Sequence, residues 1–526
     1  MKLSLNPPRS PFFKGGMLSN GLTKPLFEKE GHGEIYSANF WTTMLALALT
    51  LNRRPLSPLL IGILAIMLSG CFAVGPDYKT PDLSAPADWS QSLQGGVTAA
   101  TPDAQALAQW WGVFSDPDLS NLIERATAGN LDLKTAQARV REARARRGIA
   151  QAGFFPTLNA GGSATRSRGS EQTGSGVIRD LYRLGFDASW ELDIFGRVRR
   201  SVEAAQGDLE ASEADYHDVL VSLVAEVALN YVEARTLQTQ LDAAEANLKT
   251  QQETLQLTQW RFEAGLVSRL DVEQARGNFE STRAQLPALR SAIEEAKNRL
   301  AVLLGAFPGT LEAQLGPRKP IPEAPVEVAI GVPAETLRRR PDVRRAERQL
   351  AAQTARIGVA TADLYPTFTL PGSIGLDALT TNHFFNTANR AWSIAGSFAW
   401  PIFQGGAILQ NIEVQNALQE QVLNQYEGTI RTALEDVENA LVAYGEEQNR
   451  KQALAEATDA AQKSAELARN QYASGLIDFQ SVLDAERSLL TFQDQLAQSR
   501  GLVTSNLIRL YKALGGGWTP MSGVQP

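Results

Sequence analysis

Residues 261–268 read Arg-Phe-Glu-Ala-Gly-Leu-Val-Ser, and residues 471–478 read Gln-Tyr-Ala-Ser-Gly-Leu-Ile-Asp. The Gly-Leu pair recurs 210 residues later, and the same displacement relates landmark positions along most of the chain. The other related positions are Asp132 and Asp342, Gly148 and Gly358, Phe155-Pro156 and Tyr365-Pro366, Trp190 and Trp400, Gly196 and Gly406, and Leu304-Gly305 and Leu514-Gly515. Because each copy is long enough for several secondary elements, the sequence predicts a duplicated domain, and internal symmetry of this size is often found around a central axis.

Two long segments without proline lead to the repeated Gly-Leu pairs. Residues 201–264 number 64 and residues 407–474 number 68, and each would be about 100 Å long as an α-helix. Small apolar side chains recur in them at heptad-like spacing, with polar residues on the other faces. A second helical segment follows each Gly-Leu turn, at 269–304 and at 479–514. The sequence therefore predicts one long helical hairpin in each copy.

Shorter helical segments come earlier in each copy. Residues 118–152 and 341–363 show helical spacing, and the second begins with a proline and an aspartate, which suit the first turn of a helix. The combined length of 118–152 and 268–304 is close to that of the long helix. We therefore expect two shorter helices to stack end to end beside each long one and to form a wall of even height.

Between the short and the long helices the apolar period changes from about 3.6 to 2. Leu184, Phe186 and Trp190 alternate with polar residues, so one side of the strand is apolar, and Ile394 and Phe398 behave similarly in the second copy. Each copy offers two strands of roughly ten residues, the length that a tilted strand needs to cross a bilayer. The sequence thus predicts four strands per chain.

Four aromatic residues bracket the same end of the two strand pairs. Phe155, Trp190, Tyr365 and Trp400 are placed as an interfacial aromatic girdle would be. A four-stranded soluble sheet that packs on a helix is the alternative. If the strands cross a membrane, one chain cannot close a barrel, because hydrocarbon tolerates no unpaired sheet edge and the smallest barrels have about eight strands. Membrane insertion therefore predicts an oligomer, with eight strands from a dimer or twelve from a trimer.

The N-terminal part carries an export signal. Asn52-Arg53-Arg54 precedes a short apolar run at 59–68, a pattern that is typical of a signal peptide and too short for a permanent membrane helix. We interpret 44–70 as the signal peptide and 1–43 as a mis-assigned start.

A cysteine directly follows this apolar run. Leu68-Ser69-Gly70-Cys71 resembles the bacterial lipobox, which implies that Cys71 is lipid-modified and becomes the first residue of the mature chain. A buried cysteine at the end of a core helix is the alternative. Phe72 follows rather than the aspartate of the inner-membrane retention signal, which favours the outer membrane.

The rest of the chain divides by composition. A stretch rich in Pro, Gly, Ser and Ala precedes the first repeat, and a stretch with six prolines separates the repeats and is expected to lie on the surface. The predicted parts are an acylated tether at 71–109, repeat 1 at 110–305, an equatorial linker at 306–333, repeat 2 at 334–517 and a tail at 518–526.

Composition excludes several classes of function. The chain has 526 residues, a net charge of −7 and a pI near 5.4, so nucleic acid is a poor partner. Three histidines and one cysteine supply little material for a metal site or a nucleophile. No carboxylate pairs with a cofactor loop or a group of metal ligands. We therefore expect no enzyme activity, no cofactor and no metal.

The order of motifs resembles a known family. Val74-Gly75-Pro76-Asp77-Tyr78 follows the lipobox, Arg340-Pro341-Asp342-Val343 opens a helix, and Val482-Leu483-Asp484-Ala485 follows the second Gly-Leu turn. Together with the Phe/Tyr-Pro pairs before the strands and the segment 261–268, they resemble the TolC/OprM-like outer-membrane factors, and within them the NodT-like lipoprotein branch. The resemblance covers roughly residues 71–517.

The resemblance implies a mainly α-helical fold with a β-barrel part. Three chains would form a homotrimer with a twelve-stranded barrel in the outer membrane, continued by a long periplasmic α-helical barrel. Such proteins are passive exit ducts, which join a periplasmic adaptor protein and an inner-membrane pump, usually of the resistance-nodulation-division type. They release drugs or other small compounds.

The resemblance also assigns residues at the periplasmic end. Asp271 and Tyr472 fall on family positions that link neighbouring helices in the closed state, and Asp484 falls on an acidic constriction. Adaptor contacts are implied at Gly265, Leu266, Ser268, Gly475 and Leu476. Ser481 and Ile477 depart from one branch, which has an aspartate and an arginine there. Without the resemblance, Asp484 reads as a solvated helix carboxylate and Asp271 as a favourable charge at a helix N-terminus.

Other functions remain open at this point. A non-porous periplasmic coiled-coil lipoprotein is a second class, although strand pairs between the helices argue against it. Within the transport class, the duct could serve metal efflux or type I secretion, because the pump chooses the cargo.

Overall fold

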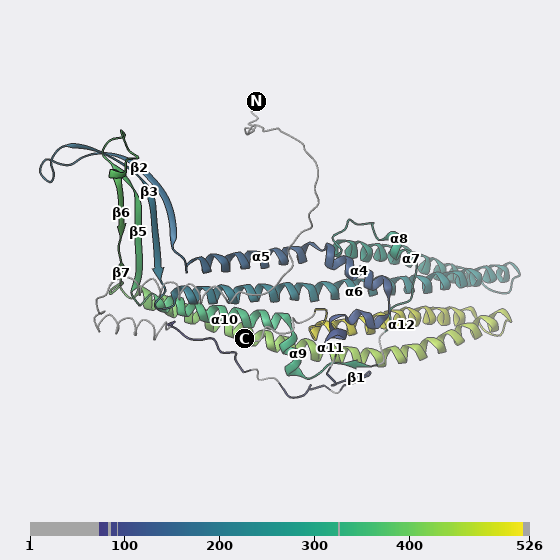
Figure 1. Ribbon diagram of the computed structural model, residues 1–526. Coiled ribbons are helices and arrows are strands. Elements are labelled where there is room, and N and C mark those ends of the chain that lie inside the picture. The colour runs from purple at the N-terminus through teal and green to yellow at the C-terminus, as the bar shows by residue number, and fades with distance from the viewer. Residues whose placement is uncertain (1–72, 83–85, 92, 102, 324–326, 519–526) are drawn as a thin grey trace, which may run out of the picture. The chain divides into compact units, whose positions relative to one another are not determined.

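The computed structural model describes residues 73–82, 86–91, 93–101, 103–323 and 327–518 (Figure 1). The predicted signal peptide, the predicted lipidation site Cys71 and most of the predicted tail lie outside the described residues.

The two repeats contain the same kinds of elements in the same order. In repeat 1 these are α4 (Pro117–Gly129), α5 (Leu131–Ala152), β2 (Thr157–Arg168), β3 (Ile178–Leu192), α6 (Arg197–Glu263) and α7 (Arg269–Leu303). In repeat 2 they are α9 (Pro333–Arg339), α10 (Pro341–Ala362), β5 (Thr367–Ala378), β6 (Arg390–Ile394), β7 (Ser397–Ala399), α11 (Ala407–Ala473) and α12 (Phe479–Ala513). The short elements are β1 (Val97–Thr98), α3 (Ala104–Ala108), α8 (Glu312–Leu315), β4 (Val328–Ala329) and the 3-10 helices η1 (Trp110–Phe114) and η2 (Thr387–Asn389). The two long hairpins predicted from the sequence are confirmed.

One predicted helix is wrong, because the segment 118–152 breaks at Asn130. Asn130 has non-helical backbone, and its side chain accepts a hydrogen bond from the Leu133 N–H, which starts α5 as a new helix. Gly129 approaches the end of α7 so closely that a Cβ there would lie 2.2 Å from the Leu304 carbonyl oxygen. Only α5 therefore continues the line of α7, and α4 packs elsewhere on α6.

The long helices lie side by side in one layer. α5 and α7 pack on α6, α6 packs on α10 and α12, and these two pack on α11 (Figure 1). Each long helix is thus accompanied by a pair of shorter helices, as predicted, although in repeat 1 only α5 and not the whole of 118–152 takes part. The layer has two outer edges, one formed by α5 and α7 and the other by α11.

The strands form one antiparallel sheet in the order β2-β3-β5-β6, with β7 also paired to β5. We predicted four strands, but the last one is interrupted at Ala395 and Gly396. The interruption lies opposite Pro371 of β5, which has no N–H to donate, and the Ala395 N–H donates to the Pro371 carbonyl at 2.9 Å. β6 and β7 therefore act as one broken strand.

The sheet has one apolar and one polar face, and the apolar face is open. Register places Leu184 opposite Leu376 and Phe186 opposite Ile374. Phe186, Ile374 and Trp392 are 52%, 64% and 75% exposed. A soluble sheet packed on a helix would bury these side chains, so their exposure argues against that alternative.

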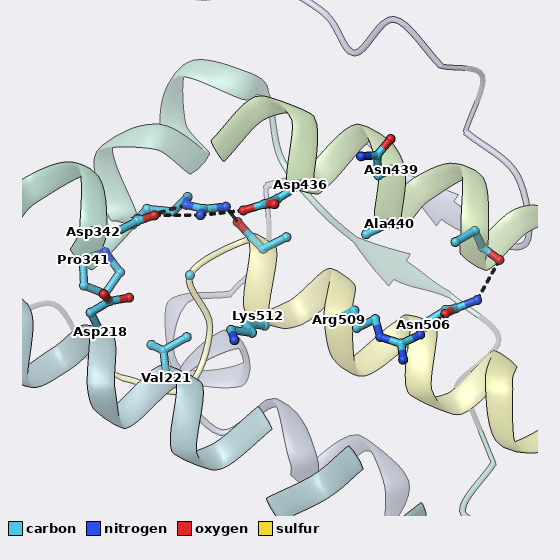
Figure 2. Close-up of a pocket in the computed structure, with 14 residues that line it drawn as sticks. Asp218, Val221, Pro341, Asp342, Asp436, Asn439, Ala440, Asn506, Arg509 and Lys512 are labelled. Atoms are coloured by element: carbon cyan, nitrogen blue, oxygen red, sulfur yellow. Dashed lines mark hydrogen bonds and ion pairs between the residues drawn. The ribbon is translucent and has the colours of Figure 1, made fainter. Parts of the chain in front are cut away.

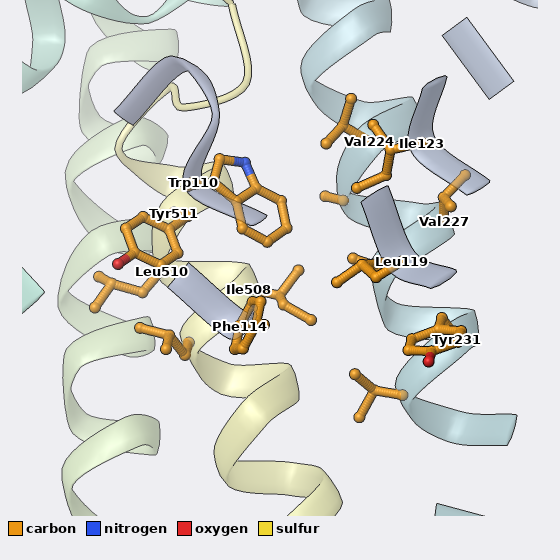
Figure 3. Close-up of a cluster of buried hydrophobic side chains, with 14 of the residues drawn as sticks. Trp110, Phe114, Leu119, Ile123, Val224, Val227, Tyr231, Ile508, Leu510 and Tyr511 are labelled. Carbon is orange, nitrogen blue, oxygen red and sulfur yellow. The ribbon is translucent and has the colours of Figure 1, made fainter. Parts of the chain in front are cut away.

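The largest hydrophobic core lies where the end of the tether meets α6 and α12 (Figure 3). Trp110 is 1% exposed and stacks on Tyr511, with ring centroids 5.4 Å apart. The predicted extended tether is thus not extended to its end, since it finishes in the short helix α3, and η1 follows at the start of repeat 1. The equatorial linker is also partly buried rather than wholly on the surface, since Leu311, Leu315 and Ile330 are 1% exposed.

Over the described residues, no helix combines the length and the apolar character needed to cross a membrane.

Candidate functional site

Both long helices end in the same kind of turn, and we call these two segments the tip turns. Gly265 has φ of +71° and Gly475 has φ of +75°, in the left-handed region that favours glycine. The next residues, Leu266 and Leu476, donate their N–H groups to carbonyls five residues earlier, at 2.8 and 2.9 Å. This Schellman arrangement ends a helix and reverses the chain. It leaves the two leucines 67% and 74% exposed.

The helices after the tip turns are capped by the same two residue types in exchanged positions. The Ser268 hydroxyl accepts from the Asp271 N–H, and the Asp271 carboxylate accepts from the Ser268 N–H at 2.9 Å. In repeat 2 the Asp478 carboxylate accepts from the hydroxyl and the N–H of Ser481, at 2.7 and 3.0 Å, and these bonds lower the pKa of Asp478. Ser481 therefore departs from the family pattern but has a capping partner in this chain.

Tyr472 lies against α6 and not against Asp271. It is 2% exposed, its ring lies 4.4 Å from the Arg261 guanidinium, and its hydroxyl lies 3.5 Å from Thr258 Oγ1. Arg261 also donates to the Tyr472 carbonyl. Within the part of the chain that the structure describes, Asp271 and Tyr472 have different partners and do not bond to each other.

Asp484 is exposed on α12 and accepts a hydrogen bond from Gln480 one turn earlier, at 3.0 Å. A single chain thus presents it as a solvated carboxylate. The structure brings Tyr472 and the tip turns together near the end of the hairpins, because Tyr472 packs on Phe479 and Val482 in one apolar cluster. Asp484 lies on the same helix as that cluster but does not contribute to it.

Glu486 is a buried carboxylate that the sequence interpretation missed. It is 4% exposed, and it accepts hydrogen bonds from Thr254 of α6 at 2.8 Å and from Asn278 of α7 at 3.5 Å. Burial raises its pKa, and the hydrogen bond from Thr254 and the charge of Arg469 only partly oppose this. The sequence contained a signal for this burial. Glu486 follows the buried Val482 by four residues, and residues four apart on a helix lie on the same face.

Replacing Glu486 with glutamine should stabilise the hairpins at neutral pH. Because its pKa is raised, Glu486 is protonated more readily in the folded chain than in the unfolded one. The stability that the protonated carboxyl contributes is complete below the pKa of the unfolded chain and is lost as pH rises through the pKa of the folded chain. We expect the melting temperature of Glu486→Gln to exceed that of the parent by about 2 °C near pH 8, roughly 1 kcal/mol, and to match it near pH 4. Thermal melting followed by circular dichroism measures this. The exposed neighbour is the control, and an equal effect of Asp484→Asn would contradict the assignment.

The four predicted girdle residues lie at one end of the sheet and remain accessible. Phe155, Trp190, Tyr365 and Trp400 are 70%, 38%, 37% and 55% exposed. The two indole N–H groups are fixed in equivalent ways, since each donates at 3.0 Å to a carbonyl 36 residues earlier. Tyrosine and tryptophan with an apolar body and a polar end are the residues that membrane interfaces favour.

Arg340 joins three helices where α12 ends and α10 begins. Figure 2 shows two of its partners, Asp342 and Asp436. Its guanidinium donates to the Ala513 carbonyl at 2.9 Å, to Asp436 of α11 at 2.9 Å and to Asp342 at 2.8 Å. Burial alone would raise the pKa of Asp342, but the hydrogen bonds and the charge of Arg340 lower it. Arg340 lies at the wall of a cavity of about 420 Å³, which Asp218 of α6 also lines.

We call the contact at Arg340 a joint, and repeat 1 has the corresponding joint with a neutral residue. Asn130, 210 residues before Arg340, donates its side-chain amide to the Leu303 carbonyl at 2.9 Å, so it links the end of α7 to the start of α5. The sequence interpretation gave Arg340 only a role in starting a helix. The joint depends on contacts between distant segments, which the local pattern does not contain.

The segment 73–78 lies across the start of α6 and the end of α10, and we call it the strap. The Val74 N–H donates to the Phe195 carbonyl at 3.1 Å, and Arg200 donates to the Val74 carbonyl at 3.1 Å and to Asp77 at 2.6 Å. Gly75 is in contact with Gly358, since a Cβ on Gly75 would lie 2.4 Å from the Gly358 Cα. The strap therefore holds the chain close behind Cys71.

Among the residues that the structure describes, no group of three or more His, Cys, Asp or Glu side chains is placed to hold a metal ion. The site therefore consists of surfaces and helix ends: two tip turns, a girdle, two joints and the strap. Such an arrangement can hold a wall together and present its ends to other molecules.

A family model described as outer membrane efflux protein matches residues 122–306 and 332–516, one match in each repeat. Nodulation protein T from Rhizobium leguminosarum bv. trifolii is 33% identical over 459 residues, which cover 87% of this chain and 97% of that protein. The toluene efflux pump outer membrane protein TtgF from Pseudomonas putida is 32% identical over 467 residues, or 87% of this chain and 96% of that protein.

A solved structure gives the same result at the level of the fold. The outer-membrane channel OprN superposes with a TM-score of 0.81 at 37% sequence identity, covering 85% of this chain and 100% of that one.

Proposed function

Because the chain belongs to the outer membrane efflux protein family, we propose that three copies assemble into one continuous passive duct through the outer membrane and the periplasm. The chain is an outer-membrane efflux channel, a conduit and not an enzyme. The observation that carries the proposed assembly is the sheet, whose apolar face is open and whose edge strands, β2 and β6 with β7, have no outer partner among the described residues.

Three such sheets would close a barrel of twelve strands if β6 and β7 count as one. Closure would pair every edge strand, which lipid requires because an unpaired backbone group there costs several kcal/mol. The apolar face would meet the lipid and the girdle residues would lie at its periplasmic boundary. The helical layers of the three chains would continue the barrel as a tube in the periplasm.

We place a lipid on Cys71. The strap fixes Val74 beside Phe195, whose ring stacks on Tyr365 at 4.7 Å. Three residues span at most about 10 Å, so a lipid on Cys71 would enter the membrane at the level of the girdle. Two anchors, acyl chain and barrel, would then act at the same depth.

The tip turns are proposed to contact a periplasmic adaptor protein, which joins the duct to an inner-membrane pump. Their exposed leucines offer small apolar contacts of the kind that helix hairpins use with one another. A pump of the resistance-nodulation-division type and a cargo of drugs or other small compounds fit relatives such as the toluene efflux protein. Metal efflux and type I secretion are the alternative uses of the same duct.

At the periplasmic end, three copies of Asp484 would form an acidic ring. Three carboxylates near one axis repel one another and attract cations, so the ring would hinder the passage of anions. Asp271 and Tyr472 are proposed to pair in the closed tube, where neighbouring subunits surround them, although each has another partner within one chain.

Conductance in a planar bilayer tests both the duct and its closed end. The purified parent protein should form channels of low conductance, and Asp271→Ala with Tyr472→Phe should raise that conductance severalfold by loosening the tip. Since Asp271→Ala also removes a helix cap worth about 1 kcal/mol, Tyr472→Phe alone separates the phenol from the cap.

Glu280→Ala, an exposed change farther along α7, is the control and should leave conductance unchanged. A parent protein without any conductance rejects the duct. A conducting parent whose double variant behaves identically rejects only the pairing of Asp271 with Tyr472.

A further inference from the structure

Helix α5 is packed by one long helix in the described chain, whereas its counterpart α10 is packed by two. α5 contacts α6, while α10 contacts both α6 and α11. Small residues that are buried in α10 are therefore exposed at the equivalent positions of α5. The buried residues are Ala355, Gly358 and Ala362, and their exposed counterparts are Ala145, Gly148 and Ala152. The open face of α5 thus corresponds to the face of α10 that α6 covers.

The open face of α5 is positively charged. Lys134 and Arg141 are exposed, lie two helical turns apart and form what we call the basic stripe. Lys134 donates only to the Gly129 carbonyl, at 3.1 Å. Arg139, by contrast, reaches back to Asp215 of α6 at 3.7 Å. The basic stripe therefore lacks a carboxylate partner in the described chain.

The other outer edge of the layer carries the opposite charge at the same spacing. Glu413, Glu420 and Glu427 of α11 are exposed and lie seven residues apart, and we call them the acidic stripe. Only Glu427 has an ion pair in the described chain, with Arg431 of its own helix at 2.9 Å. Seven residues are nearly two turns, so the three carboxylates form one line along the edge.

The contact between α6 and α10 shows how such edges fit together. Acids of α6 pair with arginines of α10 along its length. These ion pairs are Asp208 with Arg356 at 2.5 Å, Glu210 with Arg348 at 3.3 Å, and Asp215 with Arg345 at 2.7 Å. Gly207 lies so close to α10 that a Cβ there would lie 2.9 Å from the Ala352 Cβ. Small residues set the separation of these helices, and charges set their register.

Adding 210 to the residue numbers of α6 gives α11, and subtracting 210 from those of α10 gives α5. The contact between α6 and α10 is therefore a template for a contact between α11 of one chain and α5 of another. His217 and Arg344 meet at the Trp518 ring, at 4.5 and 5.6 Å, and their counterparts are Glu427 and Lys134. Glu210 has Glu420 as its counterpart. Arg348, the partner of Glu210, corresponds to Ala138, and Arg141 lies about one turn further along α5. The template therefore aligns the two stripes.

We propose that the acidic stripe of one chain binds the basic stripe of a second copy, with Glu427 against Lys134 and Glu420 against Arg141, and that this seam sets the register in which subunits join. The inference rests on the proposed trimer and adds the residues that select the partner edge. The edges differ, so the contact is head-to-tail, and in the proposed trimer three such contacts would close a ring. Exposed ion pairs are individually weak, but like charges placed opposite each other repel, so charge reversal should act strongly.

A charge swap on the full chain, purified from membranes in detergent, tests the seam. We expect the reversal Lys134→Glu with Arg141→Glu, and the reversal Glu420→Lys with Glu427→Lys, each to lower the trimer fraction at least tenfold in light scattering after size exclusion. Combining all four changes should restore trimers, because each pair is opposite in sign again. High salt should weaken the effect of either reversal.

The matched control reverses two exposed acids on α6, Glu226→Lys with Glu253→Lys, and should leave trimers intact because both sides of α6 are covered within the chain. Circular dichroism checks that each variant keeps its helices. Reversals that leave trimers intact, or a combined variant no better than either reversal, overturn the seam. A parent protein that is not trimeric overturns the proposed assembly instead.

Discussion

Arg340→Ala should cost the chain about 3 to 5 kcal/mol of folding stability, the usual effect of removing one partner from a buried ion pair. Arg340 is 8% exposed and is the only residue described here that joins the end of α12 to α10 and α11 through one side chain. Its loss would leave the Asp342 carboxylate and the Ala513 carbonyl without their shared donor. Thermal or guanidinium unfolding in detergent, followed by helical circular dichroism, measures the loss.

The same variant should change the response to acid. The pKa of Asp342 is lowered in the folded chain, so its contribution to stability is present above the unfolded pKa and disappears as pH falls through the folded one. Without Arg340 the burial of Asp342 is opposed only by the Val343 N–H and the charge of Arg345, so most of that contribution should be absent near neutral pH. The matched control is Asn130→Ala in the neutral joint, which should cost about 1 to 2 kcal/mol. Equal losses at the two joints would contradict the role assigned to the charge.

Trp110→Ala should cost a similar amount, about 3 to 5 kcal/mol, because it empties the centre of the largest core. The indole is 1% exposed, stacks on Tyr511 and meets Phe114 edge to face at 6.2 Å. We expect a lower unfolding midpoint and faster proteolysis within residues 103–114, because this segment would lose its hold on α6 and α12.

Trp111→Ala is the control for that experiment. Trp111 is adjacent in sequence and of equal size, but it is only partly buried and packs at the border of the same cluster. It should lose less than half as much stability as Trp110→Ala. If the two variants lost the same amount, the core described here would not depend on the indole of Trp110.

Much of the fold was predictable because its signals are local. The absence of proline over 201–264 and 407–474 allows long helices, and glycine at Gly265 and Gly475 supplies the left-handed backbone that ends them. Period-two alternation gave the sidedness of β3, since side chains on a strand point to opposite faces in turn. The interruption between β6 and β7 was missed because it depends on Pro371 in a neighbouring strand.

The site was less predictable, because its contacts join segments far apart in the sequence. Arg340 was interpreted as part of a helix start, yet its side chain bonds residues 96 and 173 positions away. Glu486 was overlooked, although it lies in an apolar stripe. At the tip, the family resemblance assigned Asp271 a link between neighbouring helices, and it did not indicate that Asp271 also caps a helix with Ser268.

The two joints also bear on how the wall would yield under load. The line of α7 and α5 is held by one neutral amide at Asn130, and the line of α12 and α10 by a guanidinium with several acceptors at Arg340. In a ring of three chains, more flexible lines of α7 and α5 would then alternate around the circumference with stiffer lines of α12 and α10. Bending would concentrate in the three lines of α7 and α5. The periplasmic end of the tube would then widen by outward movement of these helices, while the three lines of α12 and α10 stay in place.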